Sequence, residues 1–103
     1  MVASTYIGSD ASDEGMTLAY TANGSVVVAG YSETPTSVTY PTTTGAFKTT
    51  HGGQNGFISI FNDDLTILET STLIDGLEDS NDVSIFDAVM TASGDIVVTG
   101  TTN

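Results

Sequence analysis

Carboxylates gather in two loops of this 103-residue chain. Oxygen-rich loops suit Ca²⁺, which takes about six to eight oxygen ligands. The first loop holds Asp10, Asp13 and Glu14, and the second holds Asp75, Glu78, Asp79, Asn81 and Asp82. Neither loop has the spacing of an EF-hand, so the pattern favours solvated acidic loops. Calcium is the alternative, with Asp79, Asn81 and Asp82 as its candidate ligands.

His51 is the sole imidazole, and a catalytic histidine needs a carboxylate that orients it. Gly52 and Gly53 follow it, which predicts an exposed loop that does not hold the ring in place. The 13 carboxylates include no distinguishable pair of the kind that glycosidases use. We therefore predict no catalytic residue, no enzymatic activity and no resident cofactor.

Four tyrosines offer aromatic faces on which sugar rings stack: Tyr6, Tyr20, Tyr31 and Tyr40. Most of them fall in segments with strand-like composition, where packing against other side chains is the commoner role of an aromatic ring. A glycan-binding surface is thus an alternative hypothesis.

The net charge of −12 arises because 13 carboxylates stand against one lysine and no arginine. A phosphate backbone would be repelled by such a surface, so nucleic acid is excluded as a partner. No apolar run approaches the roughly 20 residues that span a bilayer, and the first residues lack the charged and apolar regions of a secretory signal. The chain has no cysteine and therefore no disulfide framework.

A repeated decapeptide determines how these residues are positioned. Residues 21–30, Thr-Ala-Asn-Gly-Ser-Val-Val-Val-Ala-Gly, recur as residues 91–100, Thr-Ala-Ser-Gly-Asp-Ile-Val-Val-Thr-Gly. Each copy reads as a turn followed by a β-branched strand, so the repeating unit is a β-hairpin. A single hairpin cannot bury its own apolar face, which predicts stacked sheets within one domain, residues 1–103.

β-branched and aromatic residues cluster in seven runs, which predict seven strands and no helix. The expected strands are 2–7, 16–20, 25–31, 57–61, 65–74, 85–90 and 95–101. Asn23-Gly24 and Ser93-Gly94 are expected to form two-residue hairpin turns with positive φ. The long connection from Ser32 to Gly56 is expected to be anchored on the sheet edge by Phe47, assisted by Tyr40.

Several motifs follow one another in residues 4–74: Ser-Thr-Tyr-Ile-Gly at 4–8, Asp-Glu-Gly at 13–15, the first hairpin, Pro-Thr-Thr-Thr-Gly-Ala-Phe at 41–47, Gly-Gly at 52–53 and Gly-Phe-Ile at 56–58. In this order they resemble the bacterial β-propeller repeat family known as SBBP. A truncated second copy runs from residue 70 to Gly100, with Leu73 in place of the expected tyrosine and a longer acidic loop. The resemblance implies a scaffold that occurs in tandem arrays of surface or secreted bacterial proteins, and it implies no shared catalytic residue.

A propeller blade is a four-stranded antiparallel sheet, and about four to eight blades close a ring. By this resemblance the chain holds about one and three-quarters blades: 1–8 is the outer strand of a preceding blade, 16–74 a full blade and 84–101 the inner hairpin of a second blade. Apolar residues alternate on both faces of the strands, which predicts burial on both sides. A lone chain cannot supply that burial, so we expect an interface formed by Val26, Val28, Phe57, Ile60, Ile96 and Val98.

The leading hypothesis is a structural or interaction module of an extracellular or cell-surface bacterial protein. It would self-associate into a ring or a filament. The alternatives are a glycan- or calcium-binding surface module and a fragment of a longer propeller.

Overall fold

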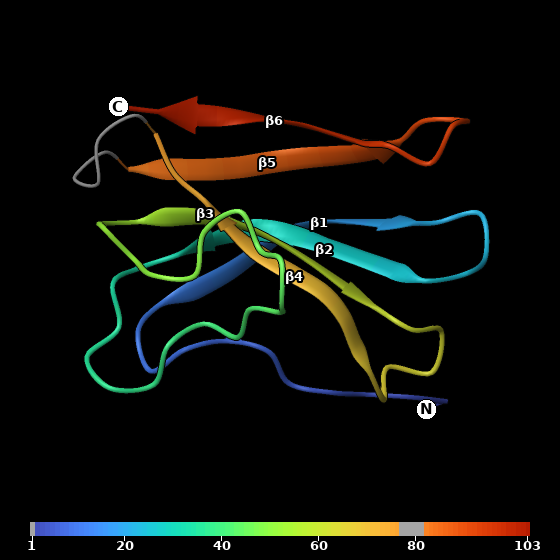
Figure 1. The fold of residues 1–103 in the computed structure, drawn as a ribbon, viewed down its shortest axis with the longest axis horizontal. Coiled ribbons are helices and arrows are strands. Elements are labelled where there is room, and N and C mark those ends of the chain that lie inside the picture. Colours follow the sequence, from blue (N-terminus) through green and yellow to red (C-terminus); the bar gives the residue numbers. More distant parts are fainter. Residues whose placement is uncertain (1, 77–81) are drawn as a thin grey trace.

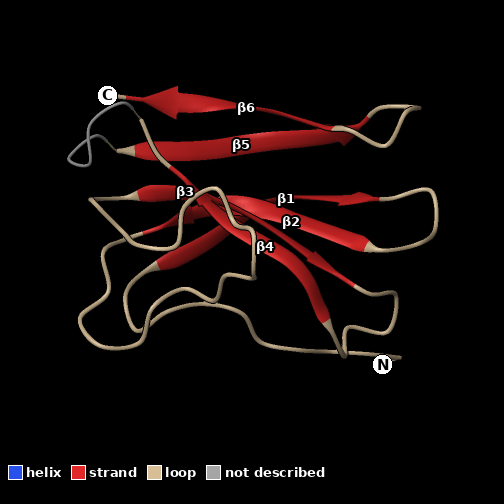
Figure 2. Cartoon of the chain, in the orientation of Figure 1, coloured by secondary structure: helices blue, strands red, loops and turns tan. Residues whose placement is uncertain are grey.

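The computed structural model describes residues 2–76 and 82–103, and this part of the chain contains six β-strands and no helix (Figures 1 and 2). The strands are β1 (Asp13–Tyr20), β2 (Val26–Ser32), β3 (Asn55–Phe61), β4 (Leu68–Ile74), β5 (Val83–Met90) and β6 (Ile96–Thr102). Every pairing between them is antiparallel. The all-β, antiparallel class predicted from the sequence is thereby confirmed.

The strands form two layers. β1, β2, β3 and β4 make a four-stranded sheet in chain order, and β5 and β6 make a separate two-stranded sheet. Figure 1 shows the β5–β6 hairpin lying over one face of the larger sheet, and β5 contacts β1, β2 and β3 there. The second hairpin thus covers a face that the first sheet would otherwise expose to water.

The two hairpins are copies of each other in structure as well as in sequence. Each residue pair of β1–β2 has a counterpart 70 residues later in β5–β6: Gly15 pairs with Gly30 as Ile85 pairs with Gly100. Both hairpins interrupt the register at the same position with a β-bulge, directly after Gly15 and Ile85. Thr17 and Asp87 occupy this same repeat position and bond to each other at 3.0 Å. The structure therefore contains a repeat with a period of 70 residues.

The hairpin turns differ from the predicted two-residue type. Thr21 N donates to Ser25 O and Gly24 N donates to Thr21 O, which defines a three-residue loop with a left-handed glycine at its end. Gly24 has φ of 88° and Gly94 has φ of 89°, whereas Asn23 does not have a positive φ. The Thr21 hydroxyl also accepts the Ser25 N–H, and this third bond favours the longer loop.

A hydrophobic core lies between the two layers. Ala29, Ile85 and Ala88 are buried at its centre, and the half-buried side chains around them are Ile58, Ile74, Ile96 and Val98. Gly56 of β3 permits this close approach, because a Cβ at that position would lie 3.0 Å from Ile85 Cγ1. The side chain of Ile85 therefore packs directly against the backbone of β3 at Gly56.

A second core lies on the opposite face of the four-stranded sheet. Tyr40 reaches it from the long connection between β2 and β3 and stacks on Phe57, with ring centroids 4.5 Å apart. The Tyr40 hydroxyl is within 2.9 Å of Ser59 Oγ, which lies 2.8 Å from Ser71 Oγ. Ser71 in turn donates to the Pro41 carbonyl at 2.7 Å. This buried chain of hydrogen bonds ties the connection to β3 and β4.

Tyr40, and not Phe47, is thus the anchor of the long connection, which corrects the prediction. Phe47 is 80% exposed. Tyr40 fits better because its ring covers Phe57 while its hydroxyl satisfies a polar group in the core, which phenylalanine cannot do. The connection also covers the outer edge of β4, since Thr43 N donates to Ser71 O and Leu73 N donates to Lys48 O.

The predicted strand 2–7 is wrong, because the structure assigns no strand to these residues. The edge of β4 is bonded to Thr43 and Lys48, and residues 2–7 form no backbone ladder with any of the described strands; they lie along the groove beside Leu18 and Val26 instead. The predicted strand 65–74 begins at Leu68 instead. Its first residues belong to a turn in which Leu65 has φ of 61° and Asn62 Oδ1 accepts the Ile67 N–H.

Candidate functional site

The strongest catalytic candidate in the structure is a serine and histidine pair. Ser32 Oγ lies 3.0 Å from His51 Nε2, a distance suited to a nucleophile and its base. Ser32, however, is fully buried, so no substrate reaches it. His51 Nδ1 is buried and bonds to no group among the described residues, so the pair lacks the orienting carboxylate of a triad.

The setting of His51 differs from the exposed, mobile loop that its glycine neighbours predicted. The ring is half-buried and bound to Ser32. Burial lowers the pKa of His51 below its ordinary value, which Asp13 and Asp75 partly counteract. We interpret the pair as a polar contact that fixes the loop on the sheet.

A second buried polar contact, an ion pair, lies near Ser32 and His51. Lys48 Nζ and Asp75 Oδ2 form an ion pair at 2.6 Å, and Asp75 is almost fully buried. Burial by itself raises the pKa of Asp75, but the hydrogen bonds from Lys48 Nζ and the Gly76 N–H help to outweigh it, and the pKa is lowered overall. Since the carboxylate is already paired, it is not available to a substrate or a metal ion.

The carboxylates of the first acidic loop are held by separate partners. Asp10 accepts bonds from the N–H and hydroxyl groups of Thr36 and Ser37 at 2.7 to 2.9 Å, and these bonds hold the pKa of Asp10 well below its usual range. Asp13 accepts the Ser9 N–H, and Glu14 accepts the Tyr31 hydroxyl. In residues 2–76 and 82–103, no three acidic or histidine side chains converge as metal ligands would.

Two of the three predicted calcium ligands, Asp79 and Asn81, lie outside the described residues. The third, Asp82, accepts the Gln54 N–H at 3.1 Å. Calcium binding therefore stays a prediction.

The tyrosines do not form one platform. Tyr40 is buried in the core and Tyr31 bonds to Glu14, while Tyr6 and Tyr20 are exposed. Glycan binding also stays a prediction, with Tyr6 and Tyr20 as the aromatic faces open to solvent.

An apolar groove lies on the side of the first sheet that does not contact the β5–β6 hairpin. The second core covers another part of this side of the sheet, and we call the part that borders the groove the open face. Its exposed residues are Leu18 and Tyr20, with the half-buried Val26 and Val28 and the buried Phe61 beside them. Residues 2–7 run along the other wall of the groove, which has a volume of about 440 Å³. Most of its lining is apolar, with Thr5 and the carboxylate of Asp63 as polar members, so the groove mainly suits apolar side chains.

A second apolar surface is the outer face of the β5–β6 hairpin, which points away from the first sheet. Val89 pairs with Val97 on this outer face. Asp87 pairs with Thr99 beside them in the backbone ladder, while its side chain accepts the Thr17 hydroxyl of the first sheet. Both valines are more than half exposed, and together with Thr99 they line a shallow hollow of about 100 Å³.

The six predicted interface residues occupy three different environments. Val26 and Val28 line the groove. Ile96 and Val98 pack between the two layers. Ile60 is half-buried and lies on the same face of β3 as Ile58, which belongs to that core. Phe57 lies on the opposite face, buried against Tyr40. Leu18, Tyr20, Val89 and Val97 were not predicted as interface residues, although they flank the repeated turns and a comparison of the two copies would have identified them.

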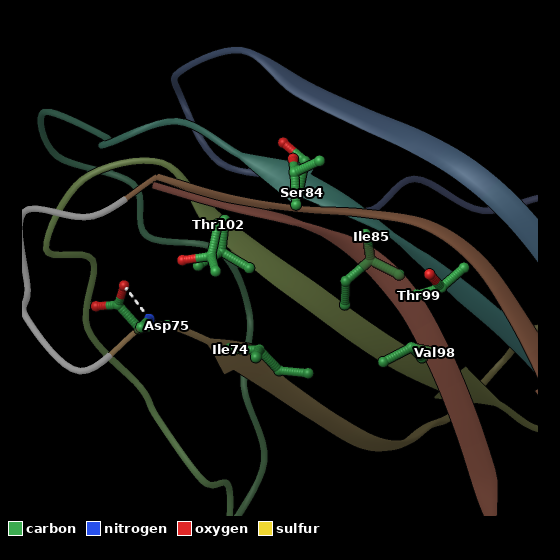
Figure 3. Close-up of a pocket in the computed structure, with 11 residues that line it drawn as sticks. Ile74, Asp75, Ser84, Ile85, Val98, Thr99 and Thr102 are labelled. Carbon is green, nitrogen blue, oxygen red and sulfur yellow. Dashed lines mark hydrogen bonds between the residues drawn. The ribbon is translucent and has the colours of Figure 1, made fainter.

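A further hollow of about 260 Å³ lies between the end of β4 and the second hairpin (Figure 3). Ile74, Ile85 and Val98 line it from three strands, and Asp75 supplies its only charged side chain among the described residues. Asp75 is paired with Lys48, and the other polar side chains that line the hollow are the hydroxyls of Ser84, Thr99, Thr101 and Thr102. The lining therefore presents no unpaired charge among the described residues.

Comparisons of the chain with protein-family models, with curated proteins and with solved structures gave no match. The described residues contain no helix long and apolar enough to cross a membrane.

Proposed function

We propose that the chain is a structural and interaction module, built of β-propeller-like blades, that self-associates through its open sheet faces. In this proposal β1, β2, β3 and β4 form one complete blade and the β5–β6 hairpin begins the next blade. The four-stranded antiparallel meander and the face-to-face stacking of the two sheets support this reading.

The observation that carries the proposal is the exposure of apolar side chains on both sides of the two-layer stack. Apolar side chains remain exposed on both outer surfaces of the stack, including Leu18, Tyr20, Val89 and Val97. Surfaces of this kind on a small protein mark sites of association.

An extracellular or cell-surface location is part of the proposal. It is supported by the SBBP resemblance and by the composition, in which hydroxyl side chains outnumber charged ones and a single lysine leaves few sites for trypsin-like proteases. A role without catalysis is supported by the burial of Ser32 and by the bonds that already engage the carboxylates of Asp10 and Asp75.

The test is the mass of the purified chain in solution, measured by light scattering over a wide range of concentration and followed by electron microscopy of the same sample. A discrete multiple of 10.6 kDa would support a closed ring, and open-ended growth would support a filament. A mass of 10.6 kDa at every concentration would overturn the proposal.

A further inference from the structure

The contact between the two repeats inside one chain provides a template for a contact between two chains. The inward side of the β5–β6 hairpin, with Ala88 and Val98, packs on the face of the first sheet that carries Ala29. Residues 70 positions earlier, Leu18 and Val28, form the open face of the first sheet. The open face is therefore the same repeat surface as the one that is covered within the chain.

The burial of equivalent positions differs sharply between the repeats. Ala88 is 5% exposed, whereas Leu18, at the same repeat position, is 64% exposed. On the opposite side of the hairpins, Val27 is 1% exposed and its equivalent, Val97, is 53% exposed. Each repeat surface is thus buried in one copy and open in the other, at opposite ends of the stack.

We infer that the open face of one chain docks on the outer face of the second hairpin of another chain, in the register of the internal contact. This inference rests on the proposed function and specifies its partner, a second copy of the same chain. The contact is head-to-tail, because it joins two different surfaces and leaves one of each free on the resulting dimer.

The shapes and chemistry of the two surfaces agree with this docking. The groove on the open face is lined mainly by apolar side chains, and Val89 and Val97 form an apolar pair on the outer face of the second hairpin. One carboxylate borders each surface, Asp63 at the groove and Asp87 at the outer face. Ile74 is the last residue of β4, precedes the β5–β6 hairpin in the chain and lines the internal contact between the repeats. Ile7 likewise precedes the β1–β2 hairpin, and it lines the groove.

Charge opposes the association without preventing it. The net charge of −12 repels a second copy, and repulsion between exposed carboxylates is screened at about 0.15 M salt over roughly 8 Å. We therefore expect association to strengthen when the salt concentration is raised, which is the reverse of an interface held by ion pairs.

Two surface variants test the pairing of faces. Leu18→Glu places a carboxylate in the open face, and Val97→Glu places one in the outer face of the second hairpin. Because docking would bury either charge without a partner, each substitution should weaken association by at least about 100-fold. Val38→Glu is the matched control, since Val38 is exposed to a similar extent on the long connection.

The decisive experiment mixes the two variants. Each variant alone has one defective face and should stay a monomer, whereas the mixture retains one intact open face and one intact outer face. We expect an equimolar mixture to form a dimer of twice 10.6 kDa by light scattering, while Val38→Glu associates like the original chain. Circular dichroism melting confirms that each variant is folded.

The outcomes separate this inference from the proposed function. If the original chain associates but either variant alone does so equally well, or their mixture stays monomeric, head-to-tail docking is overturned and self-association stands. If the original chain is a monomer in high salt at every concentration, both are overturned.

Discussion

Gly30 is the position at which the fold tolerates substitution least, and Gly30→Ala should unfold the first sheet at a lower urea concentration. A Cβ at this position would lie 1.9 Å from the Glu14 carbonyl oxygen and 3.1 Å from Gly15 Cα. Carbon and oxygen atoms across strands normally approach to about 3.3 Å, so β1 would have to retreat by more than about 1 Å. The glycine is required by this close approach at the bulge and not by its φ, which is not positive.

The cost follows from what β1 contacts. β1 is confined between β2 on one side and β5 over its face, so its retreat breaks ladder bonds and opens the core around Ala29. Two lost hydrogen bonds at about 1 kcal/mol each, and about 50 Å² of newly exposed apolar surface at about 25 cal/mol per Å², give roughly 3 kcal/mol. A domain of this size is stable by only about 5 to 15 kcal/mol, so the loss is large.

Two other glycines serve as controls. Gly100→Ala makes the same 1.9 Å contact, with the Ser84 carbonyl oxygen, but β6 does not approach the opposite sheet as closely as β1 approaches β5, so it can move more freely. We expect it to cost about half as much as Gly30→Ala, or roughly 1.5 kcal/mol by the same two terms. Gly45→Ala meets no atom within 4 Å and should cost only about 1 kcal/mol, from its φ of 85°.

The assay is urea denaturation followed by far-ultraviolet circular dichroism at low protein concentration, where association adds nothing to the free energy of unfolding. A Gly30→Ala variant within about 1 kcal/mol of the original chain, or no less stable than Gly45→Ala, would refute the assignment of this clash as the reason for glycine.

Three further predictions concern the long connection. Tyr40→Phe should lower the free energy of unfolding by about 1 to 2 kcal/mol by removing a buried hydroxyl, whereas Phe47→Ala should change it by less than about 0.5 kcal/mol, and urea melts compare the two. Lys48→Met should cost about 2 kcal/mol because Asp75 stays buried without its cation, and Lys48→Arg should restore most of that stability in the same melts. Burial lowers the pKa of His51, so the contribution of the neutral ring to stability is complete above pH 6.5 and declines as the pH falls toward the folded-state pKa. In melts between pH 5 and 8, the free energy of unfolding should therefore depend less steeply on pH for His51→Gln than for the original chain. Equal pH slopes for His51→Gln and the original chain would contradict the burial of the ring. Equal free energies of unfolding for Tyr40→Phe and Phe47→Ala would contradict Tyr40 as the anchor.

The sequence predicted the local part of this fold well. The hairpins follow from β-branched runs and turn glycines, and the recurrence of residues 21–30 at 91–100 predicted the repeat that the pairing register confirms. These features depend on residues close in the chain, where backbone preference and alternation act directly.

The errors have a common physical origin in contacts between distant segments. Phe47 and Tyr40 are both aromatic residues in a polar connection, and only the position of Ser59, on a strand that follows, favours Tyr40. Residues 2–7 have strand-like composition, but a strand requires a partner strand at hydrogen-bonding distance, and these residues lie against the side chains of the groove instead. His51 was expected to be exposed for the same reason, since its burial depends on Ser32.

The placement of apolar residues within each hairpin bears on the docking inference. A hairpin with one face in water ordinarily alternates apolar and polar residues, yet β6 begins Ile-Val-Val next to the turn and continues Thr-Gly-Thr-Thr away from it. The exposed residues of the open face, Leu18 and Tyr20, also lie next to their turn, and Figure 1 shows both turns at the same end of the molecule. A second copy stacked in the register of the internal contact would bring these two turn ends together, whereas a copy stacked in the opposite direction would set Leu18 and Tyr20 against threonines. The pattern therefore favours the parallel, head-to-tail stacking over its reverse.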